Sequence, residues 1–398
     1  MKSDFTGLNR RQALVALAAA GVTARGQAQA GSVLPLRRLH TGDVGILVAT
    51  RLTMGPSAGW WLLDSGATSH LVDPAQAANL ATESRATVAL AGGASEVRRV
   101  LLAPLQAEGG AAALTGQRAL VVDLAPLREA TGEDIHGVLG MPLLAARRAS
   151  FDLDRLELRL TESGDAADSP PPGAIDVALR LDAGLPTLEA SIAEGRRGRF
   201  LLDTGFAGAA VLFAGTAEKL ARERALPQLT LRELGGSVSA RYARLSQLAL
   251  GAYTRRDVPL ALEVGGAARR GGHFERLDGA IGLALFDGGV LTLDLPRRRL
   301  RVQHPRAASA LPGGFGFLPR QADGALVIAS VFDASPAAEA GWRPGDRWVT
   351  LDAAEAPRTP ADAWRRLYGR DEARFGLERD GATIHTTLRR ASFFPPLF

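Results

Sequence analysis

The stretch Leu62-Leu63-Asp64-Ser65-Gly66 returns 139 residues later as Leu201-Leu202-Asp203-Thr204-Gly205. Each copy places an aspartate directly after an aliphatic pair, which is typical of a buried strand that ends in a tight turn, because Asp and Gly favour turns. Two carboxyls that lie face to face can share a proton and activate water. Asp64 and Asp203 are therefore the candidate catalytic residues.

A second pair of matching segments extends the repeat beyond the two turns. His136-Gly137-Val138-Leu139-Gly140 matches Asp278-Gly279-Ala280-Ile281-Gly282 at an offset of 142 residues. Four shorter segments keep this offset: Phe151–Leu153 with Leu293–Leu295, and Leu158–Leu160 with Leu300–Val302. The two offsets differ by three residues, so we expect a loop of unequal length between the aspartate turn and the glycine strand. Two homologous halves are the simplest account.

Each half is rich in Val, Leu, Ile and Thr, in short runs that glycine clusters interrupt, which is typical of strands and hairpins. Asp73 and Pro74 suit the start of a helix over 75–80, and 215–225 is the equivalent helix in the second half. The sequence therefore predicts a mainly β fold in which each half carries one short helix.

Residues 33–305 resemble aspartic proteases of the retropepsin and pepsin superfamily, with both lobes in one chain. The resemblance rests on the aspartate turns, the glycine hairpins and the strand of two apolar residues followed by Gly, each present twice. It implies two homologous acid-protease-like β lobes over 33–162 and 174–305, which form a bilobal unit. The polar, proline-rich stretch 163–173 would link them.

The resemblance implies a mechanism in which Asp64 and Asp203 share one proton. The ionised carboxyl takes a proton from a water that attacks the peptide carbonyl, and the protonated carboxyl donates a hydrogen bond to the carbonyl oxygen. Supporting roles fall to residues of the two turns: Ser65, Gly66, Thr68, Thr204 and Gly205. In this family the hydroxyls, here of Ser65 and Thr204, tie the turns together. No metal or organic cofactor is expected.

The two turns differ in the residues that follow them. Thr68 or Ser69 could donate a hydrogen bond to the Asp64 carboxylate and favour its charged form, whereas the second turn continues with 206–208, Phe-Ala-Gly, which offers no hydroxyl. The sequence therefore predicts that Asp64 has the lower pKa and that Asp203 holds the proton.

Four glycines match the flap position of the family: Gly92, Gly93, Gly235 and Gly236. The first half has no Tyr between Arg85 and Leu105, where pepsin-like flaps often carry one, and Tyr242 lies just after the second hairpin instead. Substrate specificity therefore does not follow from the resemblance.

A third unit begins near Pro312. It opens with Gly314-Phe315-Gly316-Phe317 and continues through 335–346, where a short alanine-rich segment precedes a Pro-Gly-Asp turn. Over 314–391 the sequence resembles a PDZ domain, a small α+β barrel. The resemblance implies that the first segment binds a peptide carboxylate with backbone N–H groups and that 359–368 forms the helix beside the peptide groove.

Residues 1–30 resemble a bacterial twin-arginine export signal. Arg10 and Arg11 precede an apolar run over 13–24 that is too short and too weakly hydrophobic to span a membrane, and Ala30 is the expected cleavage position. We therefore expect a periplasmic or secreted protein with no stable membrane span once the signal is removed. The absence of Cys excludes disulfides, thiolate metal ligands and a Cys nucleophile.

Charge does not favour nucleic acid as a partner. The formal net charge is +5, and residues 1–30 hold four basic residues and one acidic residue, so a processed chain stays close to neutrality. The six His residues show no metal-ligand spacing, and His70 is expected to be a turn or surface residue rather than a catalyst. The expected partners are polypeptide substrates and a C-terminal or internal peptide at the PDZ groove.

The segment 392–398, which we name the tail, is apolar and contains Phe393-Phe394-Pro395-Pro396-Leu397-Phe398. It could dock in the PDZ groove of its own chain or pack on its own domain. Two function classes fit the sequence: an exported aspartic endopeptidase whose PDZ module selects substrates, or a non-catalytic periplasmic adaptor on an inactive acid-protease fold. A monomer is expected, and a dimer with intermolecular sites is the alternative. Carboxyls within hydrogen-bond reach would favour the peptidase.

Overall fold

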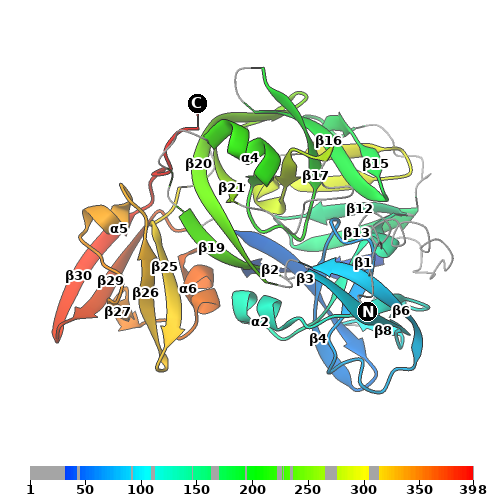
Figure 1. Ribbon diagram of the computed structural model, residues 1–398, viewed down its shortest axis with the longest axis horizontal. Coiled ribbons are helices and arrows are strands. Elements are labelled where there is room, and N and C mark those ends of the chain that lie inside the picture. Colours follow the sequence, from blue (N-terminus) through cyan, green and yellow to red (C-terminus); the bar gives the residue numbers. More distant parts are fainter. Residues whose placement is uncertain are drawn as a thin grey trace, which may run out of the picture.

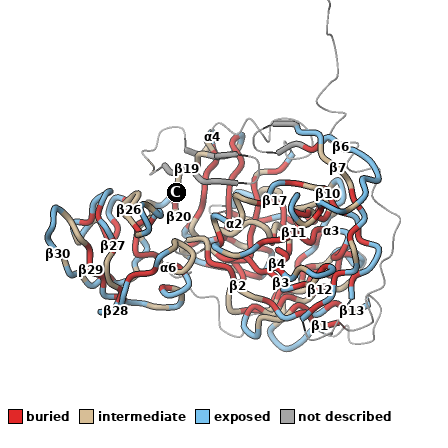
Figure 2. Tube along the Cα trace, turned by 90° about the horizontal axis from the view of Figure 1, so that it is seen from below, coloured by how far each residue is buried: buried red, intermediate tan, exposed pale blue. Residues whose placement is uncertain are grey.

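The structure is a computed structural model that describes residues 32–42, 45–90, 93–108, 113–145, 147–162, 170–192, 195–221, 226, 228–233, 236–264, 276–303 and 313–397. The fold is mainly β, as the sequence predicts, and its strands form two neighbouring lobes and a smaller C-terminal unit (Figure 1). Buried residues run through the interiors of these parts (Figure 2). Within the described residues, no helix is long and apolar enough to cross a membrane.

Lobe 1 is built on a sheet of ten described strands. They are β2 (Arg37–His40), β3 (Ile46–Met54), β4 (Ser57–Leu63), β5 (His70–Val72), β6 (Thr82–Leu90), β7 (Gly93–Leu101), β8 (Leu105–Ala107), β9 (Ala113–Leu114), β10 (Arg118–Val121) and β11 (Ile135–Leu139). Two short helices complete the lobe: α2 (Ala125–Thr131) and α3 (Met141–Leu144).

Lobe 2 is built on a sheet of eight described strands. They are β15 (Arg180–Asp182), β16 (Leu185–Ile192), β17 (Arg197–Leu202), β18 (Ala210–Leu212), β19 (Gln228–Glu233), β20 (Gly236–Leu250), β21 (Tyr253–Val264) and β22 (Gly279–Ile281). The helical segments are α4 (Ala214–Ala221) and the 3₁₀ turn η4 (Leu283–Phe286).

The two lobes place their aspartate turns in the same way. In lobe 1, β4 ends just before Asp64 and runs parallel to the glycine strand β11, with Leu63 opposite Leu139. In lobe 2, β17 ends just before Asp203 and runs parallel to β22, with Leu202 opposite Ile281. In both lobes a third strand, β5 or β18, lies antiparallel on the other side of the glycine strand. The sequence repeat is therefore a structural repeat.

A third sheet joins the two halves, which the sequence does not reveal. Its order is β1-β13-β12-β23-β24-β14. These strands are β1 (Ser32–Pro35), β12 (Arg147–Asp152), β13 (Glu157–Glu162), β14 (Ile175–Ala178), β23 (Val290–Asp294) and β24 (Arg299–Gln303). At its centre Ser150 lies opposite Thr292, with their hydroxyl oxygens 2.9 Å apart. These two residues differ by 142 positions, so equivalent strands of the repeat pair with each other.

One predicted helix is absent and another forms. Residues 74–79 make turns, in which the Asp73 carbonyl accepts the N–H groups of Gln76 and Ala77, both at 3.1 Å. A segment of six residues is too short to propagate a helix without packing support. The helix predicted over 215–225 appears as α4, and residues 222–225 lie outside the described residues. Most of the predicted linker, 163–169, also lies outside them.

The C-terminal unit is a six-stranded sheet with two helices in its described residues. The strands are β25 (Phe317–Ala322), β26 (Ala325–Val331), β27 (Arg347–Leu351), β28 (Ala354–Glu355), β29 (Glu372–Arg379) and β30 (Ala382–Arg389), and the helices are α5 (Pro336–Glu339) and α6 (Pro360–Leu367). Phe317 lies at the centre of an aromatic core with Trp342, Trp348 and Phe375. Thr359 caps α6 by accepting the N–H of Asp362 at 3.2 Å.

The C-terminal unit is bonded to both lobes. Tyr368, at the end of α6, donates a hydrogen bond to Asp287 of lobe 2, and Arg38 of lobe 1 donates to the other oxygen of Asp287 at 2.8 Å. The His40 ring of lobe 1 lies 4.4 Å from the Tyr368 ring. Asp287 therefore connects all three parts, and the C-terminal unit is docked on the lobes.

Candidate active site

Each candidate aspartate is held at the end of a buried strand. The backbone N–H of Asp64 donates to the carbonyl of Leu139 at 3.0 Å, and that of Asp203 donates to the carbonyl of Ile281 at 2.9 Å. Both acceptors belong to the glycine strands. The backbone of each aspartate is therefore held in place by the glycine strand of its own lobe.

Two hydroxyls lock the turns together across the lobes. Thr204 Oγ1 accepts the N–H of Ser65 and donates to the carbonyl of Leu63, both at 2.9 Å. Ser65 Oγ accepts the N–H of Thr204 at 3.0 Å and donates to the carbonyl of Leu202 at 2.7 Å. Ser65 and Thr204 are almost fully buried, so all four bonds are shielded from water. The reciprocal pattern brings the two aspartates together.

The glycine of each triplet lies against the carboxyl of the opposite turn. A Cβ on Gly66 would lie 2.7 Å from the Asp203 carboxyl carbon, and a Cβ on Gly205 would lie 2.4 Å from that of Asp64. Each glycine N–H also donates to the aspartate of its own turn, at 2.7 Å for Asp64 and 2.9 Å for Asp203. The two carboxyls thus lie within hydrogen-bond reach of each other. A side chain at position 66 or 205 would clash with the opposite carboxyl, so both positions require glycine.

The pKa of Asp64 is raised well above the usual aspartate value, because burial disfavours its charged form and the Asp203 carboxyl lies beside it. The opposing hydrogen bonds come from the backbone N–H groups of Gly66 and Ala67, not from the hydroxyls of Thr68 and Ser69. The hydroxyl donors that we expected at Asp64 therefore do not act on its carboxyl. The order of the two pKa values, with the shared proton on Asp203, stays a prediction.

Both aspartates are half-buried and both belong to one chain. The site is formed by the two lobes of a single chain and does not require a second copy.

His70 is buried, although the sequence predicted a turn or surface residue. It is fully buried in β5, where Nδ1 accepts the N–H of Gly140 and Nε2 donates to Gln117 Oε1, both at 2.9 Å. Burial lowers the pKa of His70 to about 4, so the ring is neutral at physiological pH. It therefore holds the end of the glycine strand beside the aspartate turn, and is not a surface residue.

The predicted hairpins form in both lobes. Gly93 begins β7 and pairs with Leu90 of β6, and Gly236 begins β20 and pairs with Glu233 of β19. Gly92 and Gly235 lie outside the described residues. The flap role of the four glycines stays a prediction.

Helix α2 is an element of lobe 1 that sequence reasoning missed. It lies between lobe 2's strand β19 and α6 of the C-terminal unit. Asp73 fixes its start, because its carboxylate accepts the N–H of Leu124 at 3.2 Å and a hydrogen bond from Arg128 at 2.6 Å. The available signal was Pro126 at the start and Gly132 at the end of a short helix.

The glycine-rich opening of the C-terminal unit, Gly314 to Phe317, is anchored at both ends. Gly314 exchanges two backbone hydrogen bonds with Ala391, at 3.0 and 3.1 Å, and the Gly316 carbonyl accepts the N–H of Phe332 at 2.9 Å. Phe315 and Phe317 are fully buried core residues. Gly316 has a φ of +85°, a conformation that favours glycine. The following strand, β25, is an edge strand that lies beside α6.

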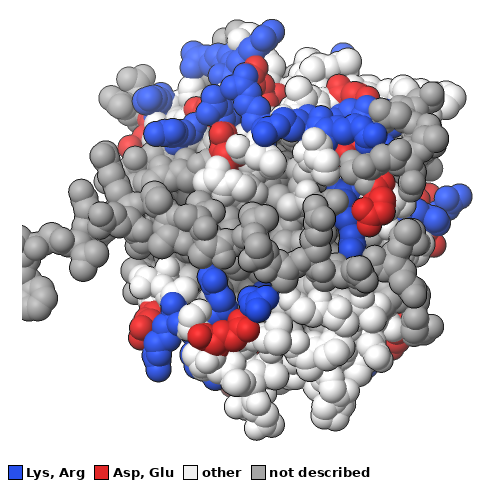
Figure 3. Space-filling view, turned by 90° about the vertical axis from the view of Figure 1, so that its right-hand side faces the viewer, with Lys and Arg blue, Asp and Glu red and all other residues white. Residues whose placement is uncertain are grey.

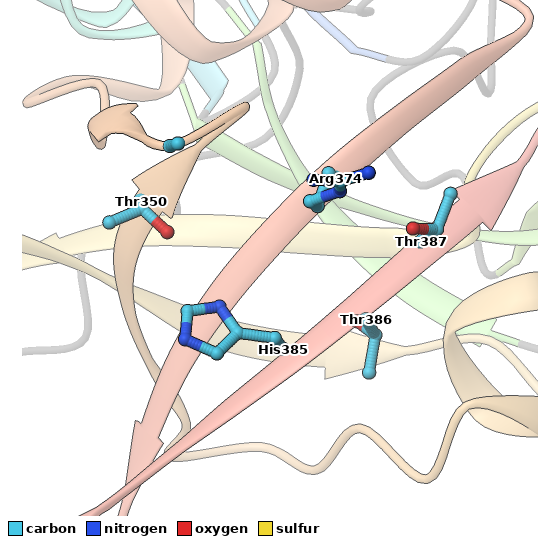
Figure 4. A pocket seen from close by; sticks show the side chains of 6 residues that line it. Thr350, Arg374, His385, Thr386 and Thr387 are labelled. Atoms are coloured by element: carbon cyan, nitrogen blue, oxygen red, sulfur yellow. The ribbon is translucent and has the colours of Figure 1, made fainter.

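A hollow of about 530 Å³ lies on the C-terminal sheet, beside strands β27, β29 and β30 (Figure 4). Thr350, Arg374 and His385 line it, and Gly376 leaves its floor open, because a Cβ there would lie 2.2 Å from Thr350 Oγ1. The hollow is open to solvent.

Charged side chains of both signs lie close together on the face shown in Figure 3. In the joining sheet, Arg299 and Arg301 pair with Asp176, the latter at 2.7 Å. Within the described residues, no group of three or more His, Asp or Glu side chains is placed to hold a metal ion.

Comparison with known proteins identifies a protease-related segment. Residues 51–143 match the family model of aspartyl proteases, and this range includes Asp64 and the glycine strand of lobe 1. The match supports a protease-like fold of the aspartic type, and the mainly β structure agrees with that class.

Three further similarities cover part of the chain or are distant. A putative zinc metalloprotease of Brucella suis biovar 1 and one of Brucella melitensis biotype 1 are each 47% identical over 60 residues, 15% of this chain. The matched part spans only 16% of the length of these relatives. Basic 7S globulin from soybean has a TM-score of 0.41 and 12% identity, and the match covers 69% of this chain and 95% of that one.

Proposed function

We propose that this protein is an exported aspartic endopeptidase in which Asp64 and Asp203 form one catalytic dyad. The observation that carries the proposal is the meeting of the two carboxyls, each packed on the glycine of the opposite turn. The family match over residues 51–143 adds support from sequence. A binding protein on an inactive fold would have no need for this close approach of two like charges, which costs stability.

In this mechanism one carboxyl of the dyad is protonated and the other is ionised. The protonated carboxyl donates a hydrogen bond to the oxygen of the scissile carbonyl, and the ionised carboxyl takes a proton from a water. That water attacks the carbonyl carbon, and the hydrogen bond from the protonated carboxyl stabilises the oxygen that gains negative charge. When the C–N bond breaks, the leaving nitrogen receives the proton that was taken from the water, and the dyad returns to its single-proton state. The residues Ser65 and Thr204 hold the geometry and take no part in proton transfer.

We further propose that the C-terminal unit recognises peptides as a PDZ module. The support is the glycine-rich opening at 314–317 followed by the edge strand β25, to which an extended peptide could add beside α6. The docked position of the unit would present such a peptide from a fixed direction. The export signal expected over residues 1–30 and a periplasmic location belong to the same proposal.

The test is digestion of a peptide library between acidic and neutral pH by the wild-type protein and by Asp64→Asn, which keeps the side-chain shape. We expect cleavage by the wild type and a loss on the order of 10²–10⁴-fold in the variant. Equal cleavage by both proteins would contradict the dyad. Absence of cleavage by a folded wild type would favour the adaptor.

A further inference from the structure

The tail contacts its own unit, as one of the two sequence expectations has it, because Phe393 and Phe394 pack on Phe332. Beyond this contact, and unlike either expectation, it crosses to lobe 2 and lies along β20 (Figure 1). The N–H of Arg244 donates to the carbonyl of Pro395 at 2.9 Å, and the N–H of Leu397 donates to the carbonyl of Arg244 at 3.0 Å. The tail therefore forms an isolated parallel bridge with β20, between Arg244 and Pro396.

Arg244 lies in a gap between the strands that flank β20 on the side away from β21. On that side β19 stops pairing with β20 at Arg241, and β16 pairs with it at Leu248 and Ala249. Both backbone groups of Arg244 are used by the tail, so the attachment completes a local gap in the sheet.

Side chains anchor the tail to two parts of the protein. Leu397 is fully buried in the hydrophobic core that the lobes share. Phe394 stacks on Tyr242 of β20, with ring centres 5.4 Å apart, and Phe332 of the C-terminal unit contacts the rings of Phe393 and Phe394 at 5.4 and 5.3 Å. The tail thus connects the C-terminal unit to lobe 2.

The attachment lies directly at the base of a hairpin. β19 pairs with the first part of β20, from Gly236 to Arg241, and the contacts with the tail begin at Tyr242. Because the tail is hydrogen-bonded to the backbone of Arg244 and packed on Tyr242, it limits how far the base of the hairpin can bend. The equivalent hairpin of lobe 1, β6 with β7, has no segment of this kind in the described structure.

We propose that tail residues 393–397 are a strap that restrains the β19–β20 hairpin and couples its position to the C-terminal unit. The occupant of this surface is the chain's own tail. The proposal does not depend on the catalytic role of Asp64 and Asp203, because it concerns the mobility of the hairpin and is measured without a substrate.

The experiment compares hydrogen exchange in the full chain and in a variant that lacks residues 393–398, with peptide-level mass spectrometry. We expect the amides of 228–241 to exchange at least tenfold faster in the variant. The amides of 82–101 in the lobe 1 hairpin should stay within twofold of the full chain. This hairpin is an internal control for a general loss of stability.

Two additions keep the test decisive. A synthetic peptide Phe-Phe-Pro-Pro-Leu-Phe should restore slow exchange in the shortened protein, whereas a peptide of the same composition in scrambled order should not. If the shortened protein does not fold, Tyr242→Ala and Leu397→Ala in the full chain should show the same selective increase. Unchanged exchange over 228–241, or an equal increase in both hairpins, would overturn the proposal.

Discussion

Replacing Thr204 by Val tests whether the reciprocal hydroxyl bonds hold the two lobes together. Valine has nearly the shape of threonine, so packing is kept while Oγ1 is lost. The Ser65 N–H and the Leu63 carbonyl then lose a buried partner that lies at 2.9 Å in both cases. Each unpaired buried group costs about 1–3 kcal/mol, so the expected loss of unfolding free energy is about 2–6 kcal/mol.

The control is Thr204→Ser, which keeps the hydroxyl and removes one methyl group, at a cost of about 1 kcal/mol. The assay is urea unfolding of both variants and the wild type at one pH, with the free energy taken from the transition. Thr204→Val should be clearly less stable than Thr204→Ser. If the two variants agree within 0.5 kcal/mol (roughly the smallest difference such curves resolve), the hydroxyl bonds do not carry the lobe contact.

Three further predictions concern the same site. The pKa of Asp64 is raised in the folded state, so its protonated side chain stabilises the protein at low pH, and this stabilisation is lost as pH rises. Asp64→Asn should therefore unfold at a higher urea concentration than the wild type at pH 7. A lower unfolding midpoint for the variant would contradict the buried like-charge pair. His70 has a folded pKa of about 4, so its neutral form stabilises the protein above the unfolded pKa, and about 3 kcal/mol of unfolding free energy is lost as pH falls from about 6.5 to 4. In His70→Gln, the unfolding free energy measured with urea should fall less over this pH range. An identical pH profile in the variant and the wild type would refute the buried position of His70. Gly205→Ala places a methyl group 2.4 Å from the Asp64 carboxyl carbon and should abolish peptide cleavage. The control Gly215→Ala, at a position with open space for a methyl group, should keep it; comparable activity in both variants would contradict the crossed packing.

Much of the fold follows from local patterns in the sequence. The duplicated aspartate turns and glycine strands, with their offsets, predict two similar lobes, since each motif depends on residues close together in the chain. Thr359 and the segment after it predict α6 for the same reason, because an N-cap is a local signal.

Other features depend on contacts between distant residues. The joining sheet pairs Ser150 with Thr292, and no local pattern announces this partner. Thr68 is near Asp64 in sequence, yet the pKa of Asp64 is governed by burial and by Asp203. The destination of the tail is set by the gap at Arg244, which exists only in the folded sheet.

The central claim is that Asp64 and Asp203 act as one catalytic unit, and a double-mutant cycle on peptide cleavage tests it most directly. The rates of Asp64→Asn, Asp203→Asn and the double variant are measured against the wild type with one cleaved peptide. Because both carboxyls serve the same step, each single variant should lose activity on the order of 10²–10⁴-fold, and the double variant should lose little more. Activity retained by either single variant, or losses that multiply in the double variant, would contradict the account.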